Sequence, residues 1–197
     1  DDIDDLATKI GAVNTIANHN GKLTGYNTDC QGAINALQNR TTLDGKSVAI
    51  IGAGGAARAI GFGLATDAGR LTILNRTRQS GERLAADLQA EFLPLDECQP
   101  KRYDILINTT PVGMYPNTAA TPIAKQALSN EMVVMDIVYH PLNTRLLKEA
   151  ADKGCLTING VDMFVFQGAH QFELWTGKKA PVAVMRQTVL QALQTNF

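Results

Sequence analysis

A glycine-rich turn between an apolar run and a helical pattern constrains the fold of this chain more than any other feature. Residues 47–51, Ser-Val-Ala-Ile-Ile, are typical of a strand that is buried on both faces of a parallel sheet. Residues 52–57, Gly-Ala-Gly-Gly-Ala-Ala, follow directly and match the G-x-G-x-x-G/A pattern of dinucleotide-binding folds. Gly52 permits the tight turn, Gly54 lets the backbone approach a pyrophosphate, and Ala57 allows the helix to pack closely on the strand. We therefore expect a dinucleotide at this helix N-terminus, with a purely structural turn as the alternative.

Strand and helix patterns alternate through the middle of the chain. The further strand patterns cover residues 70–74, 103–107, 132–136 and 156–158. The helix patterns cover the stretch from the glycine turn to about residue 66, then residues 79–89, 123–128, 144–153, 163–175 and 182–194. This alternation predicts parallel βαβ units, and hence an α/β chain with a Rossmann-type doubly wound parallel sheet and flanking helices.

The first part of the chain has a different pattern. Two runs typical of strands, residues 11–17 and 23–26, flank an Asn-Gly pair, which is a strong signal for a β-hairpin. A short helix pattern follows over residues 32–37, and we expect Thr28 or Asp29 to cap it. A hairpin and a helix are therefore expected to precede the βαβ units.

The end of the second βαβ strand indicates which dinucleotide is bound. A carboxylate about 20 residues after the glycines would accept a hydrogen bond from the ribose 2′-hydroxyl of NAD. This chain instead has Asn75, Arg76, Thr77 and Arg78 at that place, with no acidic residue. Arg76 can donate to a 2′-phosphate and Thr77 can add a hydroxyl donor, which favours NADP. The alternative is that Arg76 and Arg78 are only solvated surface cations.

Composition and charge exclude several other classes of function. Apolar residues make up 45% of the chain and charged residues 19%, as in globular proteins. The 18 Lys and Arg residues against 19 Asp and Glu residues give a formal charge of −1, so neither nucleic acid nor an anionic membrane is an expected partner. Arg58 interrupts the most apolar stretch, which leaves no membrane span. The cysteines, Cys30, Cys98 and Cys155, have no metal-type spacing, so we expect no metal site and reduced thiols in a cytoplasmic protein.

Several short blocks occur together in a fixed order along the chain. They are Gly-Ala-Val-Asn-Thr at 11–15, Gly-Tyr-Asn-Thr-Asp at 25–29, the glycine turn, Asn-Arg-Thr at 75–77, Val-Tyr-His-Pro at 138–141 and the segment 160–167. With these blocks the chain resembles the shikimate dehydrogenase family, which includes shikimate/quinate dehydrogenases, over almost its entire length. The resemblance implies reduction of 3-dehydroshikimate to shikimate with NADPH, in the chorismate route to aromatic amino acids.

The resemblance also implies roles for individual residues. Asp29 matches a catalytic aspartate that contacts a substrate hydroxyl beside a lysine. The positions that match substrate-binding residues are Asn14, Asp29, Tyr139 and Gln167. The positions implied for cofactor binding, by the turn and by the resemblance, are Gly52, Ala53, Gly54, Gly55, Ala56, Asn75, Arg76, Thr77, Asn108, Thr109, Gly160 and Met163. A polyhydroxylated cyclic carboxylate needs directional hydrogen-bond partners, which Asn14, Asp29 and Gln167 provide.

Each of these side chains also has a simpler structural interpretation. Asp29 could act only as a helix N-cap, Gln167 as an amide between helices, and Tyr139 as a packing residue. His140 and His170 are interpreted as structural rather than catalytic. A non-catalytic NADP-binding module is therefore an alternative, although such a module would not need Asn14, Asp29 and Gln167 together.

Two departures from the family pattern bear on activity. The family's catalytic lysine lies in an Asn-Val-Thr-x-Pro-x-Lys block, which this sequence does not contain, and Lys9 is too close to Asn14 to replace it. Ser80 stands where the family often has a further basic residue, which leaves the strength of the NADP preference open. The chain begins at Asp1 without an initiator Met, so we expect the amino-terminal part of the substrate domain to be absent; a trimmed tag or a disordered first Met is the alternative.

Together these features predict a domain organisation and a function. We expect the incomplete tail of a second α/β substrate domain at residues 1–28, an NADP-binding Rossmann domain at 29–159, and helices that return to the substrate domain at 160–197. The expected partner is a small molecule, 3-dehydroshikimate or shikimate, and the chain alone is expected to bind NADP but to turn over poorly. A quinate/shikimate dehydrogenase of broader specificity is the rival enzyme, and the oligomeric state is left open.

Overall fold

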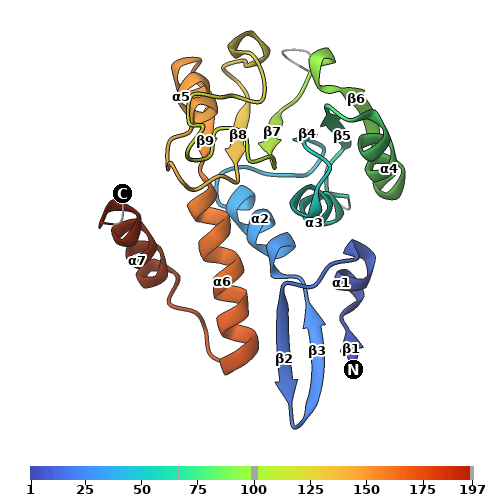
Figure 1. The fold of residues 1–197 in the computed structure, drawn as a ribbon, viewed down its shortest axis with the longest axis vertical. Coiled ribbons are helices and arrows are strands. Elements are labelled where there is room, and N and C mark those ends of the chain that lie inside the picture. The colour runs from blue at the N-terminus through green and yellow to red at the C-terminus, as the bar shows by residue number, and fades with distance from the viewer. Residues whose placement is uncertain (66, 99–101, 196–197) are drawn as a thin grey trace.

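A computed structural model describes residues 1–65, 67–98 and 102–195, which form two β-sheets joined by helices (Figure 1). The larger sheet has six strands, all parallel, in the order β6-β5-β4-β7-β8-β9. Its strands are β4 (Ser47–Ile51), β5 (Arg70–Asn75), β6 (Glu91–Pro94), β7 (Ile105–Asn108), β8 (Val133–Asp136) and β9 (Leu156–Ile158). The order reverses direction between β4 and β7, as in a doubly wound sheet. This confirms the predicted Rossmann-type α/β fold.

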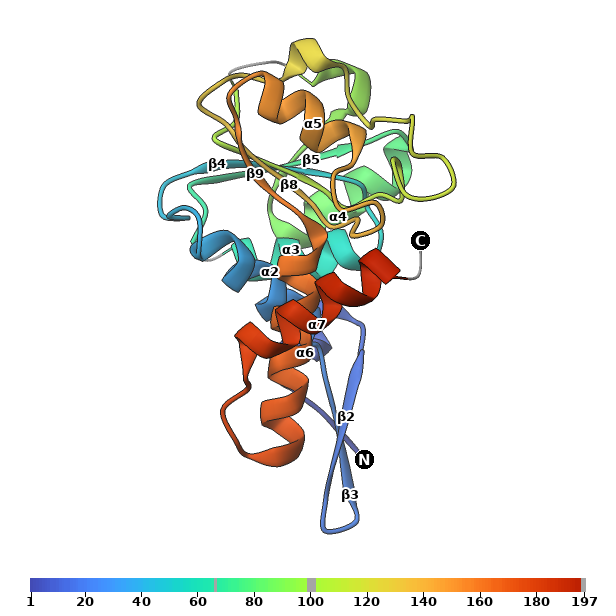
Figure 2. The same ribbon diagram turned by 90° about the vertical axis from the view of Figure 1, so that its left-hand side faces the viewer.

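Helices cover both faces of the larger sheet (Figure 2). On one face lie α2 (Thr28–Gln38), α3 (Gly55–Leu64) and α4 (Arg78–Leu88), and on the other lies α5 (Arg145–Asp152). Successive residues of β4 point to opposite faces, so Val48 and Ile50 belong to the first core. Ala49 and Ile51 belong to the second core. Because both faces of the sheet are buried, the strand is apolar nearly throughout.

The smaller sheet has the strand order β1-β3-β2 and projects away from the larger one (Figure 1). It consists of β1 (Asp2–Ile3), β2 (Thr15–His19) and β3 (Lys22–Tyr26), with α1 (Asp5–Ile10) between β1 and β2. Strands β2 and β3 pair antiparallel, and the residues between them, Asn20 and Gly21, have φ angles of 54° and 90°. Such left-handed pairs match the twist of a two-residue hairpin turn, so the predicted hairpin is confirmed.

The long helix α6 (Gly160–Thr176) connects the two sheets (Figure 1). It begins after β9, runs beside α2 and ends beside β2, where Trp175 Nε1 donates to the Ile16 carbonyl over 2.9 Å. Gly177 ends the helix in a left-handed conformation, with a φ of 65°. The last helix, α7 (Val182–Thr195), packs against α6. Helix α6 therefore carries side chains to both halves of the molecule.

The predicted cap of α2 is wrong. Asn27 is the N-cap, because its side-chain oxygen accepts a hydrogen bond from the Cys30 N–H over 3.3 Å. Thr28 and Asp29 are already inside the first turn of the helix. The Thr28 hydroxyl donates to Asn14 Oδ1 over 3.2 Å, and Asp29 lines a cavity, so both side chains are used elsewhere.

Other local differences concern short elements. Strand β1 and helix α1 are too short to give a periodic pattern, and β6 is an edge strand that ends at Pro94. The helix expected over 123–128 is only a short 3-10 helix, η2 (Lys125–Ala127). The helix end expected at residue 66 lies outside the described residues. Within the described ranges, no helix has the length and apolar character needed to cross a bilayer.

Candidate active site

A cavity of about 400 Å³ lies where the starts of α2 and α3 and the first half of α6 meet the loop after β8. Its lining residues are Asn14, Asp29, Ala56, Ile137, Tyr139, Gly160, Met163, Phe164, Gln167 and Gln171. The cavity lies at the carboxyl edge of the larger sheet, where open α/β folds bind their ligands. The structure thus brings every residue predicted for catalysis or substrate binding to one cavity. Three positions predicted for the cofactor, Ala56, Gly160 and Met163, share its wall.

The side-chain amide of Asn14 has a defined orientation. Its Oδ1 accepts hydrogen bonds from Thr15 Oγ1 over 2.8 Å, from the Thr28 N–H over 2.9 Å and from Thr28 Oγ1 over 3.2 Å. Thr15 and Thr28 are buried whereas Asn14 itself is exposed, so these hydrogen bonds are partly shielded from water. Because the oxygen is fully engaged, Asn14 presents its NH2 group as a hydrogen-bond donor in the cavity.

Asp29 is half-buried in the first turn of α2 and lines the same cavity as Asn14. Burial raises the pKa of the Asp29 carboxyl group above its ordinary value, and a hydrogen bond from Asn14 opposes this rise. A carboxyl group whose pKa is moved toward neutrality is better matched to proton exchange with a substrate oxygen than an ordinary aspartate. Asp29 is therefore the group in this cavity best suited to acid–base chemistry.

Gln171 lines the cavity although no sequence block pointed to it. Its Nε2 donates to Gln167 Oε1 over 2.9 Å and to Thr15 Oγ1 over 3.1 Å. Gln167 Nε2 in turn donates to the Phe164 carbonyl over 3.0 Å, which leaves its second N–H for a ligand. The signal that could have found Gln171 is its spacing of four residues from Gln167, which puts both amides on one face of α6.

Tyr139 and Phe164 form an aromatic wall at the cavity. Tyr139 belongs to the loop after β8, Phe164 belongs to α6, and their ring centroids are 5.2 Å apart. Both rings are partly exposed, and Met163 lies beside them in the lining. This wall offers an apolar surface for a flat ring, opposite the polar groups of Asn14 and Asp29.

Two glycines let the elements around the cavity approach closely. A Cβ atom on Gly32 would lie 2.8 Å from the Cβ and backbone N of Gln167, so α2 and α6 touch at this point. A Cβ atom on Gly160 would collide with the Ile137 carbonyl oxygen, so the start of α6 lies directly against the loop after β8. These contacts fix how far Asp29 on α2 lies from the cavity-facing side of α6.

The glycine turn after β4 has the shape that a pyrophosphate requires. Gly52 has a φ of +112°, and a Cβ atom on it would lie 2.6 Å from Thr109 Oγ1, so only glycine fits. Gly54 is the N-cap of α3 without a side-chain hydrogen bond, and Cβ atoms on Gly54 or Gly55 would meet nothing within 4 Å. The first N–H groups of α3 are therefore open to an anion, while Ala53 packs partly on the core. These residues fit a dinucleotide.

Asn75, Arg76 and Thr77 follow β5, which is the neighbour of β4 in the sheet. Asn75 Nδ2 shapes this turn by donating to the Thr77 carbonyl over 2.8 Å and to Ser80 Oγ over 2.9 Å. Arg76 and Thr77 are exposed, and Arg76 lines a second cavity of about 490 Å³. Arg78 forms an ion pair within α4 instead. Arg76 is thus an exposed cation at the end of β5, and Ser80 accepts a hydrogen bond that shapes the turn.

Asn108 and Thr109, both predicted to line the nicotinamide pocket, are placed differently from each other. Thr109 Oγ1 donates to the Ile51 carbonyl over 2.6 Å, and Thr109 lines a third cavity of about 480 Å³ together with Tyr139. Asn108 is fully buried and donates to Asp136 Oδ1 over 2.9 Å, and it is not in the lining of either cavity. Contact between Asn108 and a cofactor would therefore be indirect.

Other candidate groups lie away from the cavity or have structural partners. None of the described residues that line the 400 Å³ cavity is a lysine, and Lys9 is in the last turn of α1. His170 Nε2 lies 3.0 Å from Asn35 Nδ2, and His140 stacks on Tyr115. The described part of the chain contains no group of three His, Cys, Asp or Glu residues able to hold a metal ion. Its cysteines are free thiols.

Two family models match this chain. The model described as shikimate / quinate 5-dehydrogenase matches residues 35–144, and the model described as the shikimate 5′-dehydrogenase C-terminal domain matches residues 160–190. The first of these alone covers more than half of the chain, and together they include strands β4 to β8 of the larger sheet, α6 and part of α7.

Individual proteins agree with the family models. The chain is 47% identical over 203 residues to shikimate dehydrogenase (NADP(+)) of Methanosarcina acetivorans, covering 97% of this chain and 72% of the relative. A crystal structure of a shikimate dehydrogenase in complex with NADP+ has a TM-score of 0.94 and 42% identity, covering 98% of this chain and 71% of that one. A ligand-free 5-ketofructose reductase from Gluconobacter has a TM-score of 0.90 and 41% identity, covering 98% of this chain and 73% of that one. The chain belongs to the shikimate dehydrogenase family of oxidoreductases.

Proposed function

We propose that this chain carries the NADP site and part of the substrate site of an enzyme that reduces 3-dehydroshikimate to shikimate. The observation that carries the proposal is the meeting of Asn14, Asp29 and Gln167 at one cavity whose wall also includes the start of α3. A ligand in that cavity lies next to the glycine turn, so substrate and dinucleotide can be in contact. The relatives named for NADP-dependent shikimate dehydrogenation support this assignment.

The proposed cofactor site runs along the carboxyl edge of the larger sheet. Residues 52–56 and the N-terminus of α3 would hold the pyrophosphate, and Arg76 and Thr77 would hold the 2′-phosphate of the adenosine half. Gly160 and Met163 would lie beside the nicotinamide half. When bound, NADPH supplies a hydride, and the protein positions the ring and manages the accompanying proton.

The proposed substrate contacts follow from the orientation of the amides. Asn14 and Gln167 act as hydrogen-bond donors to oxygen atoms of a cyclic polyhydroxy acid, because their own oxygens are engaged within the protein. Asp29 accepts a hydrogen bond from a substrate hydroxyl and exchanges the proton of the reacting oxygen. Tyr139 completes the wall on the side of the loop after β8.

The proposed organisation places residues 1–28 and 160–197 in the substrate domain and residues 29–159 in the NADP-binding domain, with the cavity between them. Since no lysine lines the cavity formed by the described residues, we propose that the 197 residues by themselves bind NADP(H) but turn over slowly. A steady-state assay of shikimate oxidation by this chain tests that part, and a high kcat would contradict it.

A titration followed by nuclear magnetic resonance tests the substrate assignment. We expect shikimate, added to the NADP-saturated chain, to shift the side-chain amide signals of Asn14 and Gln167, while the exposed amide of Gln187 on α7 stays unchanged. A chain that binds NADP but shows no shift at Asn14 and Gln167 would favour a non-catalytic NADP-binding module.

A broader substrate range is the second candidate, because a 5-ketofructose reductase shares this scaffold at 41% identity. The same titration with quinate decides between the two. Shifts of Asn14 and Gln167 at similar concentrations of quinate and shikimate would favour an enzyme of broad specificity. A clear preference for shikimate would favour the narrower assignment.

A further inference from the structure

A buried carboxylate, Asp136, ends strand β8 and has no role in the proposed chemistry. It is 0% exposed, and its partner across the β7–β8 ladder, Asn108, is also 0% exposed. Both are the last residues of their strands, so the loops that leave the sheet toward the cavities begin directly after them. An ionised carboxylate is costly to bury without several hydrogen bonds, so its surroundings are informative.

Asp136 accepts hydrogen bonds at both oxygens. Oδ1 accepts from Asn108 Nδ2 over 2.9 Å and from the Val138 N–H over 3.1 Å. Oδ2 accepts from Thr144 Oγ1 over 2.7 Å, and Thr144 is the N-cap of α5. Burial raises the pKa of Asp136, and these three hydrogen bonds oppose the rise. The carboxylate therefore joins the end of β7, the loop after β8 and the start of α5.

The same type of turn ends both strands. Asp136 Oδ1 accepts from the N–H two residues later, and Asn108 Oδ1 likewise accepts from the Thr110 N–H over 3.0 Å. Such Asx-turns fix the direction in which a loop leaves its strand. The Asn108–Asp136 hydrogen bond ties the two turns together, and Thr110 Oγ1 adds a further hydrogen bond of 2.7 Å to Asn108 Oδ1.

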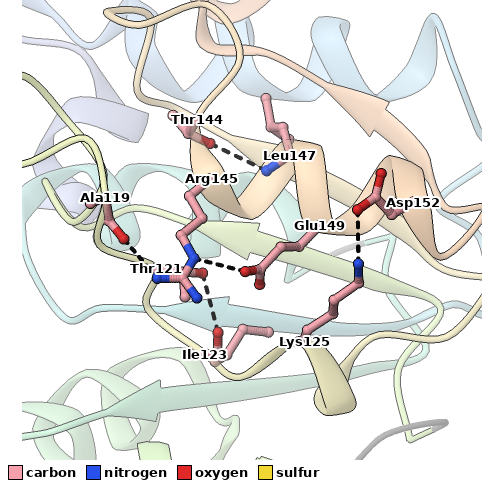
Figure 3. A network of polar contacts seen from close by, with 9 residues as sticks. All are labelled: Ala119, Thr121, Ile123, Lys125, Thr144, Arg145, Leu147, Glu149 and Asp152. Carbon is pink, nitrogen blue, oxygen red and sulfur yellow. Dashed lines mark hydrogen bonds and ion pairs between the residues drawn. The ribbon is translucent and has the colours of Figure 1, made fainter.

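The long connection from β7 to β8 is also held at a second place, on α5. Arg145, next to Thr144, donates from Nη1 to the Ala119 carbonyl over 2.8 Å and from Nε to Glu149 over 2.7 Å (Figure 3). Lys125 of the same connection pairs with Asp152 over 2.8 Å (Figure 3). These contacts lie away from the 400 and 480 Å³ cavities, whereas Thr110 and Val138 line the 480 Å³ cavity.

The loops joined by Asp136 lie on the nicotinamide side of the proposed cofactor site. Arg76 follows β5, on one side of the glycine turn in the sheet order, whereas Asn108 and Asp136 end β7 and β8, on the other side. A dinucleotide that crosses the turn therefore has its 2′-phosphate end near Arg76 and its reactive ring near the loops after β7 and β8. Ile137 and Tyr139, which flank Val138, line the 400 Å³ cavity itself.

We propose that Asp136 is a positioning residue for the nicotinamide half of the cofactor, acting through the Asn108 and Val138 turns. It does not touch the ligand, and it holds the two loops that form one wall of the ring site. The inference rests on the proposed NADP site. It goes further by separating the residues that hold the adenosine half from those that orient the ring.

Two ligands of the complete 197-residue chain test this separation. NADPH contains both halves of the cofactor, and adenosine 2′,5′-bisphosphate contains only the adenosine half with its 2′-phosphate. We expect Asp136→Asn to raise the Kd of NADPH about tenfold, as loss of hydrogen bonds to a charged group would. The Kd of adenosine 2′,5′-bisphosphate is expected to stay within about twofold of the unchanged chain.

A second variant covers the case in which Asp136→Asn does not fold. Thr110→Val removes the hydroxyl that donates to Asn108 and accepts from the Val112 N–H, and it is expected to raise the NADPH Kd about threefold without changing that of the bisphosphate. Thr121→Val is the matched control, because its hydroxyl donates to the Ile123 carbonyl in the part of the connection held by α5 (Figure 3). Because Ile123 lines the 490 Å³ cavity together with Arg76, any change that this control causes should be equal for the two ligands.

The outcomes separate the inference from the proposed function. Equal weakening of both ligands in a folded variant, or no weakening of NADPH in Thr110→Val, would overturn the positioning role of Asp136. Failure of the unchanged chain to bind either ligand would overturn the NADP site together with the inference. Selective weakening of NADPH in Thr110→Val but not in Thr121→Val would support the inference.

Discussion

The cofactor side and the substrate side of the candidate site are built in different ways. On the cofactor side, short contiguous blocks at the ends of neighbouring strands, the glycine turn and Asn75-Arg76-Thr77, present backbone N–H groups and a cation. On the proposed substrate side, single side chains from the segment before β2, from α2 and from α6 are oriented by hydrogen bonds between segments far apart in the chain, such as Gln171 with Thr15. One side depends on local backbone shape, and the other depends on how α6 packs.

This difference predicts that the two sides respond separately to mutation. A change in the α2–α6 contact should disturb the orientation of the substrate amides and leave the glycine turn intact. A change after β5 should alter the choice of cofactor and leave the substrate amides intact. The following variants test this independence, from the largest expected effect to the smallest.

The largest effect is expected for Gly32→Ala, because the added Cβ would lie 2.8 Å from Gln167. We expect the free energy of unfolding, measured in urea, to fall by about 3 kcal/mol, the upper range for overpacking. In the folded fraction, shikimate-induced shifts should be lost while NADPH binding persists. The control is Gly168→Ala on α6, where a Cβ would lie 3.5 Å from Met185 Cε, an ordinary contact. Equal destabilisation by both variants would contradict close packing at Gly32.

Arg76→Ala should give the next largest effect, on the cofactor side alone. Loss of a charge-assisted hydrogen bond corresponds to about 2 kcal/mol, so the Kd of NADPH should rise roughly thirtyfold while that of NADH changes little. Arg78→Ala is the matched control, because Arg78 is paired with Glu82 over 2.9 Å. If Arg76→Ala weakened NADPH and NADH equally, Arg76 would not contact the 2′-phosphate.

Gln171→Leu tests the orientation of the substrate amides. The variant removes the donor to Gln167 Oε1, so Gln167 is free to turn its oxygen toward the ligand. We expect the Kd of shikimate to rise about tenfold and that of NADPH to stay unchanged. Gln187→Leu, at an exposed position of α7, is the control. Unchanged shikimate binding in Gln171→Leu would mean that the hydrogen bond from Gln171 does not determine the orientation of the Gln167 amide.

The smallest effect concerns pH. Because burial raises the pKa of Asp29 from its ordinary value of 3.8, the folded chain holds more protons than the unfolded chain between that value and the raised one. The free energy of unfolding should therefore fall as pH rises through this window, and Asp29→Asn should remove this part of the fall. Asp44→Asn, in an exposed loop, is the control. A steeper fall in Asp29→Asn would show that the pKa of Asp29 is lowered.

The larger sheet and the hairpin could be predicted because their signals are local. An apolar run such as residues 47–51 is recognisable without knowledge of its neighbours, and the Asn-Gly pair at 20–21 defines its own turn. The glycine turn is equally local, since its pattern of small residues directly follows an apolar run, and Gly52 permits the positive φ that the turn adopts. Strands β1 and β6 lie at the edges of their sheets and contain no buried residue, so they lack the apolar run that reveals a central strand such as β4.

The finer arrangement of the site could not be predicted, because it depends on contacts across the chain. The sequence predicts Thr28 as a helix cap. In the structure its hydroxyl donates to Asn14, and Asn27 is the N-cap instead. The family resemblance implies that Asn108 contacts the cofactor, but its side-chain amide donates a hydrogen bond to the buried carboxylate of Asp136. In both cases a partner with a large sequence separation determines which way a polar side chain turns.

Helix α6 has one further consequence, for the distance between the two ligands. Gly160 at its first turn lies on the cofactor side, and Gln167, about two turns later, lies on the substrate side. The spacing of these contacts, about 10 Å along the axis, is set by the covalent geometry of a single helix. A tilt of the hairpin relative to the larger sheet would change access to the cavity. It would leave the separation of these two contacts unchanged.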